Sequence, residues 1–224
     1  MNEIYRRKKL LRKKRARRRA KILFSLFTVM LLLGIVILCG IKILNRLHYS
    51  NIPKTLTAIG SRTIEQKLLT PNEYSRPQNS LKKVNSIVVH YTANPGTTGE
   101  ANRNYFENLR IKKTTSASSH FVIGLEGEII QCIPLDEISY ASNDRNYDTI
   151  SIECCHPDET GKFNDKTYES LIALLSFLCG EYRLEVDDII RHYDVSGKNC
   201  PLYYVDNEDA WNKLKDDVKL SISK

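Results

Sequence analysis

The pattern of hydrophobic and polar positions divides the chain into two unlike parts. Residues 22–41 form an uncharged run of twenty positions that is rich in Leu, Ile, Val and Phe. A helix of that length rises roughly 30 Å, which is about the hydrocarbon thickness of a bilayer. Beyond about residue 82, apolar residues recur instead in short runs and at helical spacing, as in a globular domain. The pattern therefore predicts a transmembrane helix over 22–41 and a folded domain over 82–224.

Within the predicted domain, strand-like runs alternate with amphipathic stretches. Over 165–182 the apolar residues follow the i, i+3, i+4, i+7 spacing of a helix that lies on a sheet. The expected strands are 86–91, 119–124, 128–133, 149–155 and 188–192, and the expected helices are 99–110, 165–182 and one from about Asn207, capped by Asp206. This order indicates an α/β domain of about 140 residues, which is large enough for a hydrophobic core.

Residues 42–81 show no sustained periodicity and contain three prolines. They predict a polar extracytoplasmic linker with a short helix near 63–69. As a flexible coil, about 40 residues span roughly 35 Å, which sets the expected reach of the domain from the membrane.

Positive charge is concentrated at the N-terminus. Residues 1–21 hold 12 of the 34 Lys and Arg residues and one of the 26 acidic residues, which leaves a formal net charge of −3 on the remainder. By the positive-inside rule, this tail is cytoplasmic and everything after Arg46 lies outside the cell. We expect a single-pass protein of the cell membrane whose tail contacts anionic lipid headgroups, and no nucleic-acid partner. A lipoprotein signal that ends at Cys39 is a less favoured alternative, because its basic and apolar regions would be shorter.

The six cysteines do not indicate a disulfide framework. Cys39 lies in the apolar run, Cys132 and Cys154 lie in strand-like runs, and Cys179 falls on the apolar face of the helix predicted over 165–182. We expect these four to be membrane or core residues.

The segment from Arg191 to Pro201 concentrates groups that can carry chemistry. Within it, His192 and Cys200 offer an imidazole and a thiol, which are ligand types that zinc prefers. A catalytic zinc site needs a third protein ligand and an open position, and His90, at the end of a predicted strand, is the best candidate. A histidine in that place is more often an ordinary hydrogen-bonded residue. The rival pair Cys155-His156 is treated as structural, because adjacent strand residues point to opposite faces.

Amide hydrolysis at such a metal site requires two further groups. A carboxylate must accept the proton of the attacking water and pass it to the leaving nitrogen, and a cation must stabilise the oxyanion. Glu153, on the polar face of a predicted strand, and Lys198 are the natural candidates. The alternative interpretation is a surface ion pair for Glu153 and a solvated loop residue for Lys198.

Four motifs, in this order and spacing, resemble the zinc-dependent N-acetylmuramoyl-L-alanine amidases of type 2. They are Val88-Val89-His90-Tyr91-Thr92, Ser119-His120-Phe121, Ile150-Ser151-Ile152-Glu153 and the segment from His192 to Pro201. The resemblance spans about 84–204 and implies a central mixed sheet with flanking helices. It also implies zinc bound by His90, His192 and Cys200, with Glu153 as catalytic acid and Lys198 assisting the oxyanion. The implied substrate is peptidoglycan, cleaved between N-acetylmuramic acid and L-alanine of the stem peptide.

The sequence departs from the family pattern at two places. Some relatives have a catalytic tyrosine where this chain has Ser119, so the chemistry here would depend on Glu153. Some have a Trp-His pair where this chain reads Tyr140-Ala141, so substrate contacts there would differ. His120 matches a family position, and we expect it to support the site or to pack.

Three functions follow from this pattern. The favoured one is a membrane-tethered peptidoglycan amidase that acts as a monomer. A non-catalytic peptidoglycan-binding module is the second, although such relatives commonly lack the cysteine ligand. The third is a membrane-anchored amidase that acts on another acyl-amino acid.

Overall fold

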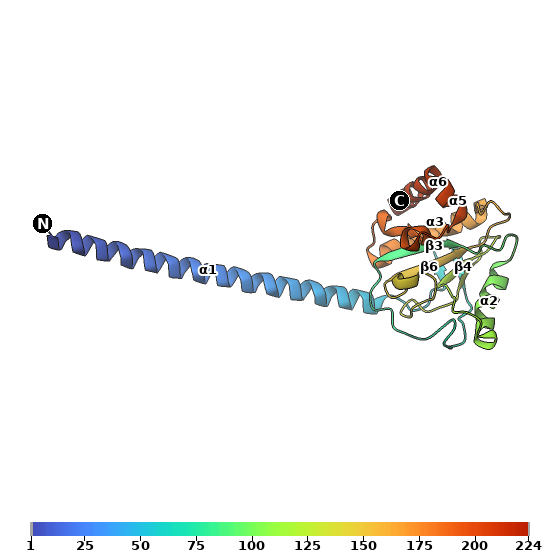
Figure 1. Cartoon of the computed structure of the whole chain (residues 1–224), viewed down its shortest axis with the longest axis horizontal. Helices are drawn as coiled ribbons and strands as arrows, with labels where there is room; N and C mark the ends of the chain where they lie inside the picture. Colours follow the sequence, from blue (N-terminus) through green and yellow to red (C-terminus); the bar gives the residue numbers. More distant parts are fainter. Residues whose placement is uncertain (1, 224) are drawn as a thin grey trace. The chain divides into compact units, whose positions relative to one another are not determined.

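The computed structural model describes residues 2–223, and they form two units. The first ends at Asn51 and the second begins at Ile52. The first unit is a single helix, α1 (Asn2–Asn51). The second is a mixed sheet covered by helices on both faces (Figure 1).

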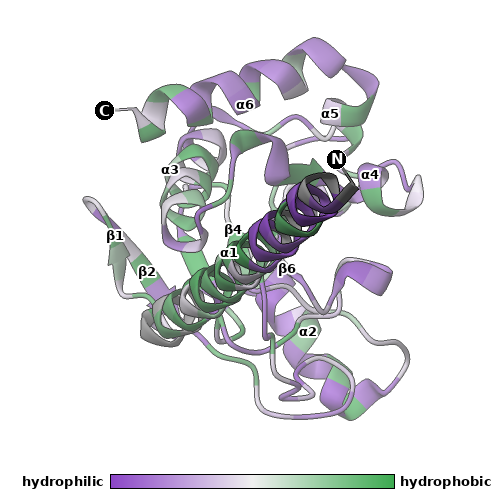
Figure 2. Ribbon diagram, turned by 90° about the vertical axis from the view of Figure 1, so that its left-hand side faces the viewer, coloured by the Kyte–Doolittle hydropathy of each residue, from purple (hydrophilic) through white to green (hydrophobic). Residues whose placement is uncertain are grey.

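Helix α1 changes in character along its length. Its first five turns are strongly hydrophilic and the following stretch is hydrophobic, as the hydropathy colouring shows (Figure 2). The large apolar side chains between Ile22 and Leu44 are exposed, for example Phe24 at 70% and Met30 at 72%. Among the described residues, α1 contains one stretch, Arg6–Leu44, that is long and apolar enough to cross a membrane by length and composition. Signal sequences share both properties.

The sheet of the second unit has seven strands in the order β1-β2-β5-β4-β6-β3-β7. The neighbours β4, β6, β3 and β7 are parallel, β5 is antiparallel to β4, and β1 is antiparallel to β2. The expected mixed sheet with flanking helices is confirmed, and the expected strands 119–124 and 128–133 contain the antiparallel neighbours β4 and β5. The strands are β1 (Ala58–Ile59), β2 (Arg62–Gln66), β3 (Ser86–Tyr91), β4 (Phe121–Ile123), β5 (Ile129–Gln131), β6 (Thr149–Cys154) and β7 (Ile189–Arg191).

Helices cover both faces of this sheet. Helix α2 packs on one face through Phe106 and Leu109, and α3 packs on the other face with α6 behind it (Figure 1). The helices are α2 (Gly99–Lys112), α3 (Asp165–Tyr182), α4 (His192–Ser196), α5 (Leu202–Asp206) and α6 (Glu208–Ile222), with 3-10 turns η1 (Asn143–Arg145) and η2 (Val186–Asp188). The prediction that Asp206 caps the last helix is wrong, because Asp206 ends α5 and Asn207 precedes α6.

The prediction of a flexible linker over 42–81 is wrong. Helix α1 continues to Asn51, and residues 52–81 belong to the second unit. Five apolar residues that share no periodicity are buried there: Leu56, Ile59, Ile64, Leu69 and Leu81. The expected helix near 63–69 is strand β2, which pairs with β5. Burial of these scattered residues offsets the entropy of ordering the segment, so the free tether is much shorter than 40 residues.

The buried cysteines contribute to the core as expected. Cys132 and Cys154 are fully buried in or beside strands, and Cys179 is 2% exposed on α3. All six cysteines carry free thiols. On the α2 side, Cys132 and Cys155 join one apolar cluster, whose other buried members are Leu69, Phe106, Val122, Ile130 and Ile133.

Candidate active site

Parallel pairing of β3 and β6 creates the site. In this register His90 lies opposite Glu153, at the carboxyl ends of the two strands. On the other side of β3, Val89 pairs with Arg191, so His192 continues β7 at the level of His90. Register neighbours point to the same face of a sheet. The three side chains therefore converge although they come from distant parts of the chain.

His90, His192 and Cys200 form a compact and buried cluster. Their ligand atoms all lie within 4.8 Å of one another, and Nδ1 of His90 is 3.8 Å from Sγ of Cys200. The two imidazole rings meet edge to face, with centroids 4.8 Å apart. A tetrahedral zinc ion with ordinary bond lengths separates nitrogen and sulfur ligands by roughly 3.3–3.6 Å. The ligand atoms would thus need to approach one another by at most about 1.5 Å to hold a zinc ion.

The cluster also leaves buried polar atoms without partners. Both ring nitrogens of His192 and Oε2 of Glu153 are buried and have no hydrogen-bond partner. Buried polar groups in proteins are almost always paired, and exceptions often mark an ion or a catalytic role. The donor set of two imidazoles and one thiol therefore fits a zinc ion.

The electrostatics of the metal-free cluster favour neutral forms. Burial lowers the pKa of His90 well below its ordinary value, and the neighbouring His192 and Lys198 add to the effect. Burial also lowers the pKa of His192 and raises the pKa of Cys200 to about 12. Burial raises the pKa of Glu153 to about 8, against a smaller opposing effect of Lys198. Neutral imidazoles are the forms that bind metals, and a metal would convert the thiol to a thiolate.

A cleft of about 420 Å³ opens over this cluster on the α2 side of the sheet. The cluster and Glu153 lie at its base, and the exposed residue Lys198 lies on its lining. Its remaining lining comes from Tyr91, Phe106, Ser116, Ala117, Ser118, Tyr140, Ala141, Asn143 and Asn146.

Sequence reasoning missed most of this wall. Residues 116–118 and 140–146 lack periodicity, and only Tyr140-Ala141 stood out, through the family comparison. Asn143 adopts a left-handed conformation with φ of 51°, which asparagine tolerates better than most residues. The sequence contains no signal that places Asn143 on the cleft, and only the folded structure shows it there.

His120 and Ser119 belong to a second buried polar group, which contacts Ser151 of β6. His120 is fully buried, its Nδ1 contacts the backbone N–H and hydroxyl of Ser151, and its Nε2 is 2.9 Å from the carbonyl of Glu137. The hydroxyl of Ser119 bonds to the carbonyls of Phe121 and Ser151. His120 therefore packs beneath the site as expected, and Ser119 points away from the cleft.

The side chains of Cys155 and His156 have different surroundings, as expected for adjacent residues that point to opposite faces of a strand. Cys155 accepts a hydrogen bond from the amide of Asn102 at 3.4 Å on the α2 side. His156 Nδ1 is 2.7 Å from the carbonyl of Asp158, and its ring packs against Tyr91 at 5.1 Å. Within residues 2–223, the one group of three such side chains with metal-ligand spacing is His90, His192 and Cys200.

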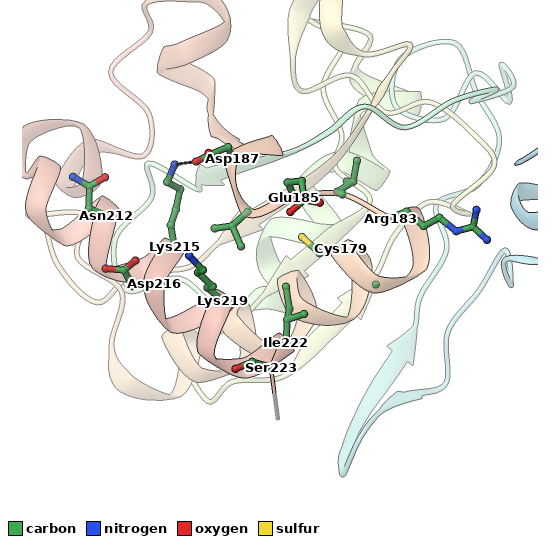
Figure 3. Close-up of a pocket in the computed structure, with 13 residues that line it drawn as sticks. Cys179, Arg183, Glu185, Asp187, Asn212, Lys215, Asp216, Lys219, Ile222 and Ser223 are labelled. Carbon is green, nitrogen blue, oxygen red and sulfur yellow. Dashed lines mark hydrogen bonds and ion pairs between the residues drawn. The ribbon is translucent and has the colours of Figure 1, made fainter. Parts of the chain in front are cut away.

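A larger cavity, of about 770 Å³, lies between the end of α3, η2 and α6 (Figure 3). Its lining mixes charged residues of both signs, and Lys215 is paired with Asp187 at 2.6 Å. None of the predicted site residues lines it. Volume alone would favour this cavity, but its lining offers no buried polar atom that lacks a partner, so we place the site in the smaller cleft.

Comparison with known proteins identifies the family of the chain. Residues 80–202 match the N-acetylmuramoyl-L-alanine amidase family. The N-acetylmuramoyl-L-alanine amidase BlyA of Bacillus subtilis (strain 168) is 34% identical over 173 residues, which are 68% of this chain and 46% of that protein. CwlL of Bacillus licheniformis, with the same enzyme name, is 34% identical over 161 residues, 66% of this chain and 44% of that protein. The chain thus spans less than half the length of these relatives.

Solved structures share the fold of the second unit. A mutant endolysin from Bacillus subtilis superposes with a TM-score of 0.59 at 29% identity, covering 70% of this chain and 99% of the other. The catalytic domain of XlyA gives a TM-score of 0.59 at 28% identity, with the same coverage of both chains. Sequence match and fold agree: the chain belongs to the N-acetylmuramoyl-L-alanine amidase family.

Proposed function

We propose that this protein is a zinc-dependent peptidoglycan amidase that hydrolyses the amide between N-acetylmuramic acid and the L-alanine of the stem peptide. The observation that carries the proposal is the convergence of His90, His192 and Cys200 beside the buried carboxyl of Glu153. The family supplies the substrate, because its named members are N-acetylmuramoyl-L-alanine amidases.

A zinc ion held by these three residues would act as a Lewis acid, which polarises the amide carbonyl and lowers the pKa of a bound water. Glu153 accepts the proton of the attacking water and returns it to the leaving amine of alanine. Burial raises the pKa of Glu153 to about 8 in the metal-free site, and a zinc ion nearby would lower that pKa toward the range in which the carboxylate accepts a proton. Lys198, a cation on the cleft, stabilises the oxyanion as the carbonyl becomes tetrahedral.

Mass spectrometry of the products tests this proposal. The full chain, in detergent, is incubated with a muramyl peptide that carries at least three stem residues, and free N-terminal alanine is sought. Zinc content is measured on the same sample. Cleavage at this amide, lost on chelation and restored by zinc, supports the proposal. Zinc binding with peptide bound and uncleaved would identify a recognition module instead, and cleavage of other acyl-amino acids alone would identify a different amidase.

We further propose that α1 anchors the domain in the cell membrane with its basic end in the cytoplasm. The exposed apolar side chains between Ile22 and Leu44 and the basic run before them support this. Only about ten residues, 42–51, separate the apolar run from the second unit, and as a helix they rise about 15 Å. The amidase would then act close to the bilayer, as a monomer. Recovery of the intact N-terminus in carbonate-washed membranes tests the anchor, whereas a cleaved N-terminus would show a signal sequence.

A further inference from the structure

His90 differs from His192 because its second ring nitrogen has a partner. The hydroxyl oxygen of Ser142 lies 3.4 Å from His90 Nε2, in a fully buried environment. His90 Nδ1 lies on the side of Cys200, at 3.8 Å from its Sγ. The ring thus presents one nitrogen to the cluster and the other to Ser142. His192 has no partner at either nitrogen.

We propose that Ser142 is a positioning residue that holds the His90 imidazole with Nδ1 toward the metal. This inference rests on the metal centre of the proposed function. A neutral imidazole carries a single N–H, so the nitrogen that donates it fixes which nitrogen keeps a lone pair. Donation from Nε2 to the Ser142 hydroxyl leaves the Nδ1 lone pair for the metal. Histidine ligands in metalloproteins commonly donate their other N–H to such an acceptor.

The backbone of Ser142 is held in place by the turn around it. The amide oxygen of Asn146 accepts the backbone N–H groups of Ser142 and Ala141, at 2.7 and 3.0 Å. The carbonyl of Ser142 accepts the N–H of Arg145, and the carbonyl of Arg145 accepts the hydroxyl of Thr149 at the start of β6. Because the turn is tied to the strand that carries Glu153, Ser142 keeps a fixed place relative to the site.

The same turn forms part of the cleft wall. Ala141, Asn143 and Asn146 line the cleft, and Ser142 lies among them but contacts His90. This wall also contains Tyr140-Ala141, where some relatives have a Trp-His pair. The segment that borders the substrate therefore also orients a proposed metal ligand.

A matched pair of serine variants tests the inference through zinc affinity. The full chain in detergent, with Ser142→Ala or Ser118→Ala, is titrated with zinc against a competing chelator. Ser118 is the control: it is buried at 2% exposure, lines the same cleft, and its hydroxyl accepts the N–H of Tyr140 at 3.0 Å without touching a proposed ligand. We expect Ser142→Ala to weaken zinc binding about 10- to 100-fold and Ser118→Ala to stay within about twofold of wild type.

Nitrogen-15 NMR of the zinc-loaded wild type gives a second measurement that does not depend on variant folding. We expect the proton of His90 on Nε2. A proton on Nδ1 would overturn the inference, as would unchanged zinc affinity in Ser142→Ala or an equal loss in Ser118→Ala. A wild type that binds zinc and leaves muramyl peptide uncut would overturn the activity and not the positioning role. A wild type that takes up no zinc would overturn both.

Discussion

Two buried clusters of polar side chains, one around His120 and one around His192, differ in whether their polar atoms have hydrogen-bond partners. Around His120, each ring nitrogen has a partner, Ser151 or Glu137, and Ser119 is also bonded. Around His192, both ring nitrogens and a carboxyl oxygen of Glu153 have none. The cluster around His120, the satisfied group, has its hydrogen bonds formed within the protein and stabilises one arrangement of the core. The cluster around His192, the unsatisfied group, has polar atoms that are free to bind a metal or a substrate. The difference in hydrogen bonding distinguishes His192 and Glu153, in the candidate active site, from His120 in the core.

The largest expected effect on the unsatisfied group comes from Cys200→Ser, which removes a proposed zinc ligand. Serine is a poor zinc ligand at neutral pH, so we expect loss of stoichiometric zinc and of amidase activity. Loss of about 4 kcal/mol of transition-state stabilisation corresponds to roughly a thousandfold lower rate. Zinc analysis and the muramyl-peptide assay measure the two effects. A variant that keeps both zinc and activity would contradict the proposed ligand set.

Glu153→Gln separates catalysis from metal binding. The amide cannot accept the water proton, so kcat should fall about 10²- to 10⁴-fold while zinc affinity changes little. Asp148→Asn is the matched control, because that carboxylate lies at the other end of β6 and pairs with Arg145. Equal activity of Glu153→Gln and wild type would make Glu153 structural.

His120→Ala changes the satisfied group, so it should lower the stability of the fold and leave zinc binding intact. It removes the partners of the Ser151 N–H and the Glu137 carbonyl, and each unsatisfied buried group costs about 1–3 kcal/mol. We therefore expect the free energy of unfolding to fall by at least about 2 kcal/mol, with zinc affinity retained. Chemical denaturation and zinc titration measure both quantities. Zinc loss without destabilisation would place His120 in the metal site.

Stability of the metal-free protein against pH should show His120 and Glu153 with opposite signs. Burial lowers the His120 pKa to about 4, so the unfolded chain binds the extra proton and this stabilisation is lost as pH falls from 6.5 to about 4. The Glu153 pKa is raised to about 8, so its contribution is lost as pH rises from 4.5 through about 8. Above pH 6.5 the Glu153 effect remains, at most about 1.4 kcal/mol per pH unit, and the buried thiols add a decline of the same sign as the pH approaches 9.

Denaturation of the metal-free full chain at several pH values checks this slope. Stability should fall more steeply between pH 6.5 and 8 in the wild type than in Glu153→Gln, which keeps only the smaller decline due to the buried thiols. The same decline in Glu153→Gln would assign it to another group.

Much of the fold was predictable where local pattern and tertiary packing agree. Helix α3 occupies the predicted range 165–182, because its apolar stripe is long and is matched by the sheet below it. The predicted linker failed for the opposite reason. Leu56 and its neighbours carry no periodicity, and their order depends on Gln131, whose side chain bonds to the Leu56 N–H and the Lys54 carbonyl. No local signal connects positions so far apart.

The sequence by itself determined the residue types of the site and predicted the elements that carry them: strands 86–91 and 188–192, with His90 and His192 near their ends, and a Gly-containing loop that ends at Cys200. It also determined the basic and apolar halves of α1. Tertiary structure alone decided that β3 lies between β6 and β7, so that Glu153 and His192 meet at His90, and that Ser142 faces the second nitrogen of that ring. The physical reason is that strand order and register are set by contacts between distant segments, which local periodicity does not encode.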